Sequence, residues 1–279
     1  MRLLVTNDDG IDAPGIAHLA EAMRPLGDVV VVAPDREFSG ASQSVGSLMH
    51  HIPGVRRRTI PGTEAAWEVA GPPALCVYYA HLGLFGPAPD LVVAGINPGA
   101  NVGRSVYHSG TLGACIAARN FGTSGVAVSQ AAPVGAAVEG QAITDVLAMQ
   151  KWHVAAAVAQ RFVSAVIDDL PAEAVVANVN VPNVELADIA GWRLADVAVL
   201  PAASMADAVL VPRDDDPDGY DVDVRWQRAT EVPPTTDVGT VWSRSVSVSY
   251  ITRLAHHART DLTDAEAALD DLFGSSRAT

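Results

Sequence analysis

The chain has 279 residues, of which 49% are hydrophobic, 18% charged and 5% aromatic, a composition typical of a folded protein and not of a disordered one. Its 18 Lys and Arg against 32 Asp and Glu give a net charge of −14, which argues against binding to nucleic-acid polymers or anionic membranes. No leader-like segment precedes the first apolar run, and no apolar run reaches the roughly 18 residues of a membrane span. We therefore expect a cytoplasmic protein.

The first half of the chain alternates apolar runs with segments of helical periodicity. Residues 3–6 form an apolar run typical of a strand buried on both faces, residues 15–23 have the spacing of a helix, and residues 27–34 resemble a second buried strand. Further helices are expected at 73–84, 110–122 and 142–167, and further strands at 90–101, 125–130 and 174–182. This order predicts an α/β fold with a Rossmann-like open, mostly parallel sheet.

The pattern changes after residue 190. Several segments alternate apolar with polar residues, which is typical of strands with one solvated face, and an acidic, turn-rich stretch occupies residues 214–221. A last helix is expected at about 264–272. We predict an α/β core at 1–190 that carries the functional site, followed by a β-rich C-terminal region at 191–279 with a terminal helix.

Three loops with unusual polar residues are expected at the carboxyl ends of the parallel strands, where ligands bind in open α/β sheets. The first contains Asp8 and Asp9, the second Ser39 and the third Asn97. Two adjacent carboxylates repel each other unless a cation lies between them. Carboxylate, hydroxyl and amide oxygens suit Mg²⁺ or Mn²⁺, whereas the simpler alternative is helix capping with solvated charge.

The third loop ends in a short sequence, Ser-Gly-Thr at 109–111, directly before a predicted helix. Free backbone N–H groups and the helix dipole favour an anion such as phosphate there, although an ordinary serine N-cap is the alternative. Arg104 in the same loop either meets a substrate anion or is exposed to solvent. The donors around Ser39 strengthen the phosphate interpretation.

Four motifs in register resemble the survival protein SurE family of metal-dependent 5′/3′-nucleotidases: NDDGxxAPG at 7–15, VVAPDREFSGAS at 31–42, PDLVVAGINxGANxG at 89–103 and YHSGT at 107–111. The resemblance implies a divalent metal, Mg or Mn, held by Asp8, Asp9, Ser39 and Asn97. It implies contacts to the substrate phosphate from Asn101, Ser109, Gly110 and Thr111. It further implies a C-terminal arm exchanged between the subunits of a homodimer or homotetramer.

The chain also departs from the family pattern. Ala94 stands where the family has Ser, Ala117 and Ala118 replace a Glu-Gly pair, and residues 72–76 differ from the usual Thr-Pro-(Ala/Thr)-Asp-Cys. Arg259 occupies the position of a C-terminal histidine. Either His256 or His257 takes over that role, or both are surface residues.

We hypothesise that the protein hydrolyses nucleoside 5′- and 3′-monophosphates, with Asp8 as catalytic carboxylate and Asn101 beside the phosphoryl group. The alternative is a SurE-like protein that binds metal or nucleotide and has lost turnover. A haloacid-dehalogenase-type phosphatase separates its two carboxylates by one residue, and a Rossmann oxidoreductase needs G-x-G-x-x-G after the first strand; this chain has neither pattern. The preferred nucleotide, the physiological metal and the choice between dimer and tetramer stay open.

Overall fold

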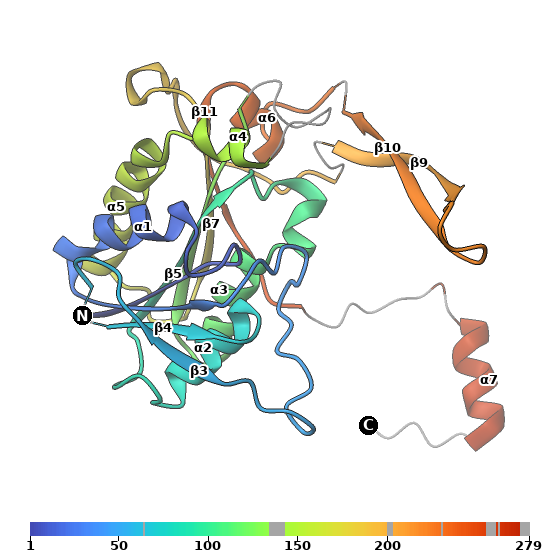
Figure 1. Ribbon diagram of the computed structural model, residues 1–279, viewed down its shortest axis with the longest axis horizontal. Helices are drawn as coiled ribbons and strands as arrows, with labels where there is room; N and C mark the ends of the chain where they lie inside the picture. The colour runs from blue at the N-terminus through green and yellow to red at the C-terminus, as the bar shows by residue number, and fades with distance from the viewer. Residues whose placement is uncertain are drawn as a thin grey trace.

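The computed structural model describes residues 1–63, 65–133, 143–199, 203–229, 231–254, 261 and 263–273. Within these residues, nine strands form one sheet in the order β3-β4-β2-β1-β5-β6-β7-β11-β8 (Figure 1). The strands of this sheet are β1 (Arg2–Thr6), β2 (Asp28–Pro34), β3 (Val55–Arg58), β4 (Ala65–Val69), β5 (Leu91–Pro98), β6 (Ser124–Gln130), β7 (Val176–Val181), β8 (Gly191–Leu194) and β11 (Ser245–Tyr250). The α-helices are α1 (Pro14–Met23), α2 (Pro73–His81), α3 (Gly110–Asn120), α4 (Ile143–Ala148), α5 (Trp152–Asp168), α6 (Asp237–Trp242) and α7 (Thr263–Phe273). Short 3₁₀ helices are η1 (Arg24–Leu26), η2 (Gly103–Tyr107) and η3 (Leu186–Asp188).

The centre of the sheet is parallel. β4, β2, β1, β5, β6 and β7 all run in the same direction, with Leu3 of β1 aligned to Val29 of β2 and to Leu91 of β5. Among the described residues of this sheet, antiparallel pairing is limited to β3 beside β4 and β11 beside β7, and β8 then runs parallel to β11. The predicted open, mostly parallel α/β sheet is confirmed.

Helices cover both faces of this sheet, which explains the continuous apolar strands. Leu3 and Val5 of β1 belong to one hydrophobic cluster, together with residues of α1 and α5. Leu4 points to the opposite face and belongs to a second cluster, which includes residues of α2 and α3. Because successive side chains of a strand point to opposite faces, Leu3, Leu4 and Val5 are each buried under one of the two helical layers.

The single long helix predicted at 142–167 is wrong, because α4 ends at Ala148 and α5 begins at Trp152. The side chain of Asn183 binds the backbone at this break. Its Oδ1 accepts a hydrogen bond from the Lys151 N–H (3.0 Å), and its Nδ2 donates to the Met149 carbonyl (3.2 Å). A side chain from elsewhere in the chain thus satisfies backbone groups that a continuous helix would have paired internally.

The segment after residue 190 contributes to two structures. β8 and β11 extend the main sheet, whereas β9 (Ala203–Pro212) and β10 (Tyr220–Arg228) form a separate antiparallel ribbon. Figure 1 shows this ribbon and α7 standing away from the main sheet. The main sheet therefore continues past residue 190, where the α/β core was expected to end. The division of the chain into a core and a C-terminal region stays a prediction.

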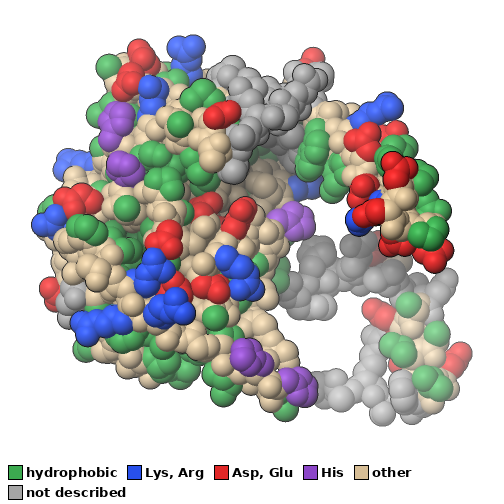
Figure 2. Space-filling view, viewed as in Figure 1, with side chains coloured by type: hydrophobic (Ala, Val, Ile, Leu, Met, Phe, Trp, Pro, Cys, Tyr) green, Lys and Arg blue, Asp and Glu red, His purple; other side chains and the backbone are tan. Residues whose placement is uncertain are grey.

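The β9–β10 ribbon combines acidic and hydrophobic side chains on its surface (Figure 2). Leu210 and Val222 lie opposite each other on the two strands and are 66% and 59% exposed, and Trp226 is 61% exposed. Several large apolar side chains grouped on one exposed ribbon are unusual for a monomer surface. None of the described helices is long and apolar enough to cross a membrane.

A close contact between α1 and β5 yields a prediction for stability. A Cβ atom added to Gly15 in α1 would lie 2.1 Å from the carbonyl oxygen of Ile96 in β5. At an exposed position within a helix, replacing glycine by alanine stabilises the folded protein by about 1 kcal/mol. Here we expect Gly15→Ala to lower the free energy of unfolding, measured in urea, by about 1–3 kcal/mol, because the helix must move away from the strand.

The control is Gly54→Ala, because a Cβ at Gly54 meets nothing within 4 Å. We expect this variant to stay within about 0.5 kcal/mol of the parent. Equal unfolding free energies for the two variants would contradict the proposed contact.

Candidate functional site

The loop after β1 is joined by backbone hydrogen bonds to the loop after β2. The N–H of Ile11 donates to the carbonyl of Pro34 (2.9 Å), and the N–H of Phe38 donates to the carbonyl of Asp8 (2.7 Å). Gly10 adopts φ +101°, in the left-handed region that favours glycine, and its carbonyl accepts a hydrogen bond from Asn7 Nδ2 (2.8 Å). These bonds bring the segment that contains Ser39 to the carboxylate pair.

The carboxylate of Asp8 lies at the N-terminus of α3. Its Oδ2 accepts a hydrogen bond from the N–H of Gly110 (3.1 Å), and its Oδ1 accepts one from the hydroxyl of Thr111 (2.5 Å). A Cβ on Gly110 would lie 2.7 Å from the Cβ of Asp8, so a larger residue cannot occupy this position without displacing Asp8. The helix N-terminus thus holds an anion from the protein itself, as its dipole favours.

Both carboxylates are in an environment that disfavours negative charge. Burial raises the pKa of Asp8, which is 3% exposed, although hydrogen bonds from Thr111 and Gly110 oppose the shift. Burial, followed by the charges of Asp8 and Glu37, raises the pKa of Asp9 to about 8. Among the described residues, no Lys, Arg or His forms an ion pair with Asp8 or Asp9.

Two oxygen atoms of the same loop also lack hydrogen-bond partners. Asn7 Oδ1 and Asp9 Oδ2 are buried, and neither has a partner within the part of the chain that the structure describes. Buried polar atoms in native proteins are nearly always paired with protein, water or an ion. A divalent cation bound here would reduce the repulsion between the two carboxylates and would give the unpaired oxygens a partner.

The oxygen donors of the predicted ligands suit such a cation, and their binding to one common ion stays a prediction. Asn97 donates from its Nδ2 to the carbonyl of Gly99 (2.6 Å), which leaves its Oδ1 as the atom for a metal, and Ser39 is exposed at the same edge of the sheet. The described residues contain no cluster of three or more His, Cys, Asp or Glu that could hold a metal. A site built on Asp8 and Asp9 therefore needs neutral oxygens, and this all-oxygen set suits Mg²⁺ or Mn²⁺.

The predicted phosphate turn has a different arrangement from the one the sequence suggested. The hydroxyl of Ser109 accepts a hydrogen bond from the Leu112 N–H (3.0 Å) and is the N-cap of α3, the alternative interpretation of this serine. The Gly110 N–H and the Thr111 hydroxyl bind Asp8. The turn therefore positions the carboxylate of Asp8 in this structure, and its contact with a substrate phosphate stays a prediction.

Asn101 is joined to residues that the sequence analysis did not single out. Its side chain donates to the Ser129 hydroxyl (2.9 Å), and its backbone is bound by the side chains of Asn178 and Asn180. The signal in the sequence was the pair of asparagines at alternate positions of the otherwise apolar strand 174–182. Polar residues on one face of a buried strand indicate a specific partner.

Asp237 is a second residue that sequence reasoning missed as part of the site. It is fully buried, and its carboxylate accepts hydrogen bonds from the N–H groups of Gly103 (2.8 Å), Ala198 (3.0 Å) and Val238 (2.8 Å). Gly103 follows Asn101 by two residues, so Asp237 fixes the loop of the site. In the sequence, this aspartate stands in the stretch Thr-Thr-Asp-Val at 235–238, a weaker resemblance to the same family pattern and the signal that could have marked this position.

The structure also places the departures from the family pattern. Ala94, Ala117 and Ala118 are fully buried within the hydrophobic cluster between the sheet and α2 and α3, where small apolar side chains pack well. Arg104 donates from Nε to the carbonyl of Val199 (2.8 Å), so it contacts the C-terminal segment. Arg259, His256 and His257 lie outside the described residues.

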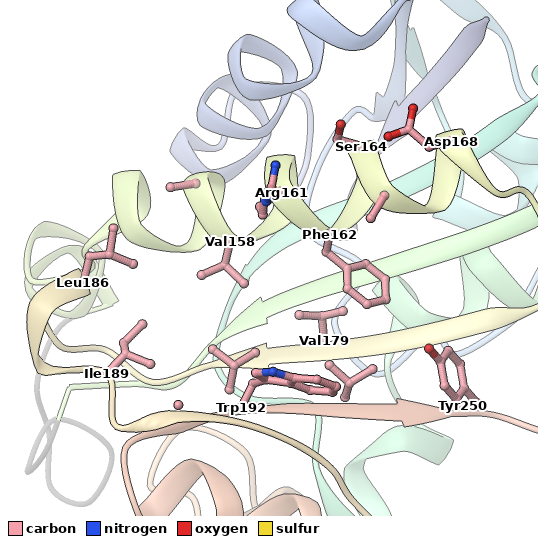
Figure 3. A pocket seen from close by; sticks show the side chains of 15 residues that line it. Val158, Arg161, Phe162, Ser164, Asp168, Val179, Leu186, Ile189, Trp192 and Tyr250 are labelled. Carbon is pink, nitrogen blue, oxygen red and sulfur yellow. The ribbon is translucent and has the colours of Figure 1, made fainter.

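A hydrophobic pocket of about 720 Å³ lies elsewhere, between α5 and the sheet strands β7, β11 and β8. Figure 3 shows Phe162 extending from α5 toward the sheet, where Trp192 and Tyr250 lie. None of the residues predicted to bind metal or phosphate lines this pocket. The carboxylate pair, at the carboxyl end of β1, is therefore a separate site.

Comparisons with known proteins agree with the motifs. A family model described as Survival protein SurE matches residues 3–201. Proteins named 5′-nucleotidase SurE from Xanthomonas campestris pv. campestris (strain B100) and Xanthomonas axonopodis pv. citri (strain 306) are each 42% identical over 196 residues, 70% of this chain and 68% of theirs. The crystal structure of the SurE protein from Aquifex aeolicus superimposes with a TM-score of 0.71 at 27% identity, covering 98% of this chain and 99% of that one. The chain therefore belongs to the survival protein SurE family.

Proposed function

We propose that this protein is a metal-dependent phosphomonoesterase that hydrolyses nucleoside 5′- and 3′-monophosphates to a nucleoside and inorganic phosphate. One observation carries the proposal: Asp8 is buried, the adjacent Asp9 is half-buried with a buried, unpaired Oδ2, and no described cationic side chain is bound to either carboxylate. The name 5′-nucleotidase of the relatives from Xanthomonas supports the reaction class. The 3′ activity and the metal rest on the resemblance of the motifs and on the donor set.

The residues that would hold the cation are Asp8, Asp9, Ser39 and Asn97. A divalent cation supplies polarisation of a phosphoryl oxygen and lowers the pKa of water. Asp8, held in place by Gly110 and Thr111, orients the attacking water and accepts its proton. The water oxygen forms a bond to phosphorus, the bond from phosphorus to the ester oxygen breaks, and the nucleoside oxygen takes a proton from solvent as it leaves. Asp8 then releases to solvent the proton that it accepted.

Asn101 and the first turn of α3 supply the groups that we assign to the substrate phosphate. The amide of Asn101 donates one N–H to Ser129, and its other N–H has no partner among the described residues, so it can donate to a phosphoryl oxygen. Fixed donors of this kind stabilise the negative charge that develops on the transferring group without reorganising in the reaction. Ser109, at the start of α3, is the second donor that we assign to the phosphate.

We also propose that the protein is a homodimer or homotetramer in which the C-terminal arm contacts another subunit. The exposed apolar side chains of the β9–β10 ribbon support this assembly, and so does the position of α7 away from the main sheet (Figure 1). The substrate is a small nucleotide, with no role for nucleic-acid polymers or membranes. The cytoplasmic location stays a prediction.

The reaction is tested by measuring phosphate release from nucleoside monophosphates with Mn²⁺, with Mg²⁺ and with a chelator. We expect release only with a divalent metal, and we expect Asp8→Asn to lower kcat by at least about 100-fold because it removes the proton acceptor and a ligand charge. Asp12→Asn is the control, since Asp12 lies in the same loop but is exposed and pairs with Arg58. Equal rates for all proteins and conditions would contradict the proposal, and nucleotide binding without release would identify the inactive alternative.

The raised pKa of Asp9 predicts how the metal-free protein responds to pH. The pKa rises from an ordinary value of 3.8 to about 8 in the folded state, so between these values the folded state binds more protons than the unfolded state. The contribution of Asp9 to stability is therefore complete below pH 3.8 and is lost as pH rises toward 8. We expect the urea midpoint of chelator-treated protein to fall between pH 6 and pH 8.5, and Asp9→Asn to reduce this fall.

Metal binding supplies the check on this pH dependence. Mn²⁺ replaces the proton on Asp9, so we expect the stabilisation by saturating Mn²⁺ to be larger at pH 8.5 than at pH 6. A metal-free protein that is more stable at pH 8.5, with Asp9→Asn showing the same profile, would contradict the assigned environment of Asp9.

The assembly is tested by sedimentation velocity. We expect the parent to sediment as a dimer or tetramer and the double variant Leu210→Ser with Trp226→Ser to shift toward smaller species, because two of the most exposed large apolar groups of the ribbon are removed. Leu82→Ser is the control, since Leu82 is equally exposed (67%) but lies at the end of α2. A monomeric parent would contradict the proposed assembly.

A further inference from the structure

The backbone and side chain of Asn101 are bound by side chains from two neighbouring strands. The Asn101 N–H donates to Asn180 Oδ1 (2.8 Å), and the Asn101 carbonyl accepts from Asn180 Nδ2 (3.2 Å) and Asn178 Nδ2 (2.8 Å). The Asn101 side-chain Nδ2 donates to the Ser129 hydroxyl (2.9 Å). Asn101 is 8% exposed and the other three residues are fully buried, so solvent does not compete for these bonds.

The register of the sheet explains why Ser129, Asn178 and Asn180 lie close together. Ser129 of β6 is aligned with Asn180 of β7 on one side and with Asn97 of β5 on the other. Asn178 and Asn180 occupy alternate positions and therefore share a face of β7. Asn101 thus binds Ser129 and Asn180, which the register aligns across the sheet with the proposed metal ligand Asn97.

These amides are an unusual choice for a central strand. The other face of β7 consists of Ala177, Val179 and Val181, which belong to the hydrophobic core. Parallel strands covered on both faces are normally apolar, and burying an amide without full hydrogen bonding destabilises the fold. Asn178 keeps a buried Oδ1 without a partner among the described residues. Such a local departure from what favours stability is expected where a functional group must be held in place.

The side chain of Asn180 is placed to fix both the position and the orientation of the Asn101 backbone. Its side-chain amide binds the N–H and the carbonyl of the same residue, which are the two backbone bonds that an adjacent strand would supply. Asn101 lies beyond the end of β5, where none of the described strands provides these two bonds. Ser129 then fixes the orientation of the Asn101 side chain.

We propose that Asn180 is a positioning residue that, with Ser129, holds the side chain of Asn101 against the phosphoryl group. The inference rests on the proposed function and deepens it, because it assigns a role to two residues that do not themselves touch substrate. Through Asn180, strand β7 acts on the site that the N-terminal loops form. Misplacing a reacting or stabilising group by about 1 Å lowers rates by up to about 100-fold.

The test compares Asn180→Leu with Asn183→Leu. Asn183 also makes one donor and one acceptor hydrogen bond to backbone groups, but at the break between α4 and α5. We expect Asn180→Leu to lower kcat for a nucleoside monophosphate by roughly 10- to 100-fold, with the Kd for Mn²⁺ changed less than about threefold. Asn183→Leu is expected to keep kcat within about threefold of the parent, and urea unfolding reports the stability of both variants.

A double-mutant cycle asks whether Asn180 acts through Asn101. We expect Asn101→Ala combined with Asn180→Leu to be no slower than Asn101→Ala alone, because the residue that is positioned has already been removed. Additive losses of kcat would overturn the proposal. Ser129→Ala is the second variant; it removes one hydroxyl and is expected to lower kcat by about 10-fold even if Asn180→Leu fails to fold.

Binding of inorganic phosphate in the presence of Mn²⁺, measured by calorimetry, separates this inference from the proposed function. If the parent hydrolyses nucleotides and neither Asn180→Leu nor Ser129→Ala differs from Asn183→Leu, the positioning role fails and the function stands. If the parent binds phosphate without hydrolysis, weaker binding by Asn180→Leu and Ser129→Ala supports the positioning of Asn101 while the hydrolytic function fails. A parent that neither binds phosphate nor hydrolyses nucleotides overturns both.

Discussion

Electrostatic repulsion between two neighbouring carboxylates in a buried loop is the constraint around which this site is organised. Water does not screen Asp8, and Asp9 lies beside it with a pKa raised to about 8. The fold contributes neutral donors to Asp8 from Gly110 and Thr111 but no described cationic side chain. The charge is therefore only partly compensated by the protein, which is the condition under which a divalent cation binds strongly.

The parallel sheet makes this arrangement possible. Carboxyl ends of parallel strands lie at one edge, so loops from β1, β2 and β5 meet although they are separated by up to about ninety residues of sequence. Close approach is then decided by small residues. Gly110 lies against Asp8, and a Cβ on Gly113 would lie 2.1 Å from the carbonyl of Ser42, so α3 approaches both loops only because these positions lack side chains.

Residues from the C-terminal part of the chain stabilise the loop at 97–109. Asn178 and Asn180 bind Asn101, and Asp237 binds Gly103 and Ala198 through one carboxylate. Ala198 precedes the β9–β10 ribbon and Asp237 follows it, so both ends of the ribbon are joined to this loop. A partner that engages the ribbon would therefore act on a segment in direct contact with the site.

The α/β class, five of the six parallel strands and the loops that carry Asp8, Asp9, Ser39 and Asn97 were predictable from the sequence alone, because apolar periodicity and strand-end motifs are local properties. The parallel strand β4 was not predicted. Tertiary structure decided the rest. The side chain of Asn183 divides the helix predicted at 142–167, and β8 and β11 join the main sheet, because both outcomes depend on partners distant in sequence. Likewise, the binding of Gly110 and Thr111 to Asp8, and of Asn180 to Asn101, follows from packing across some eighty to one hundred residues, which no local pattern encodes.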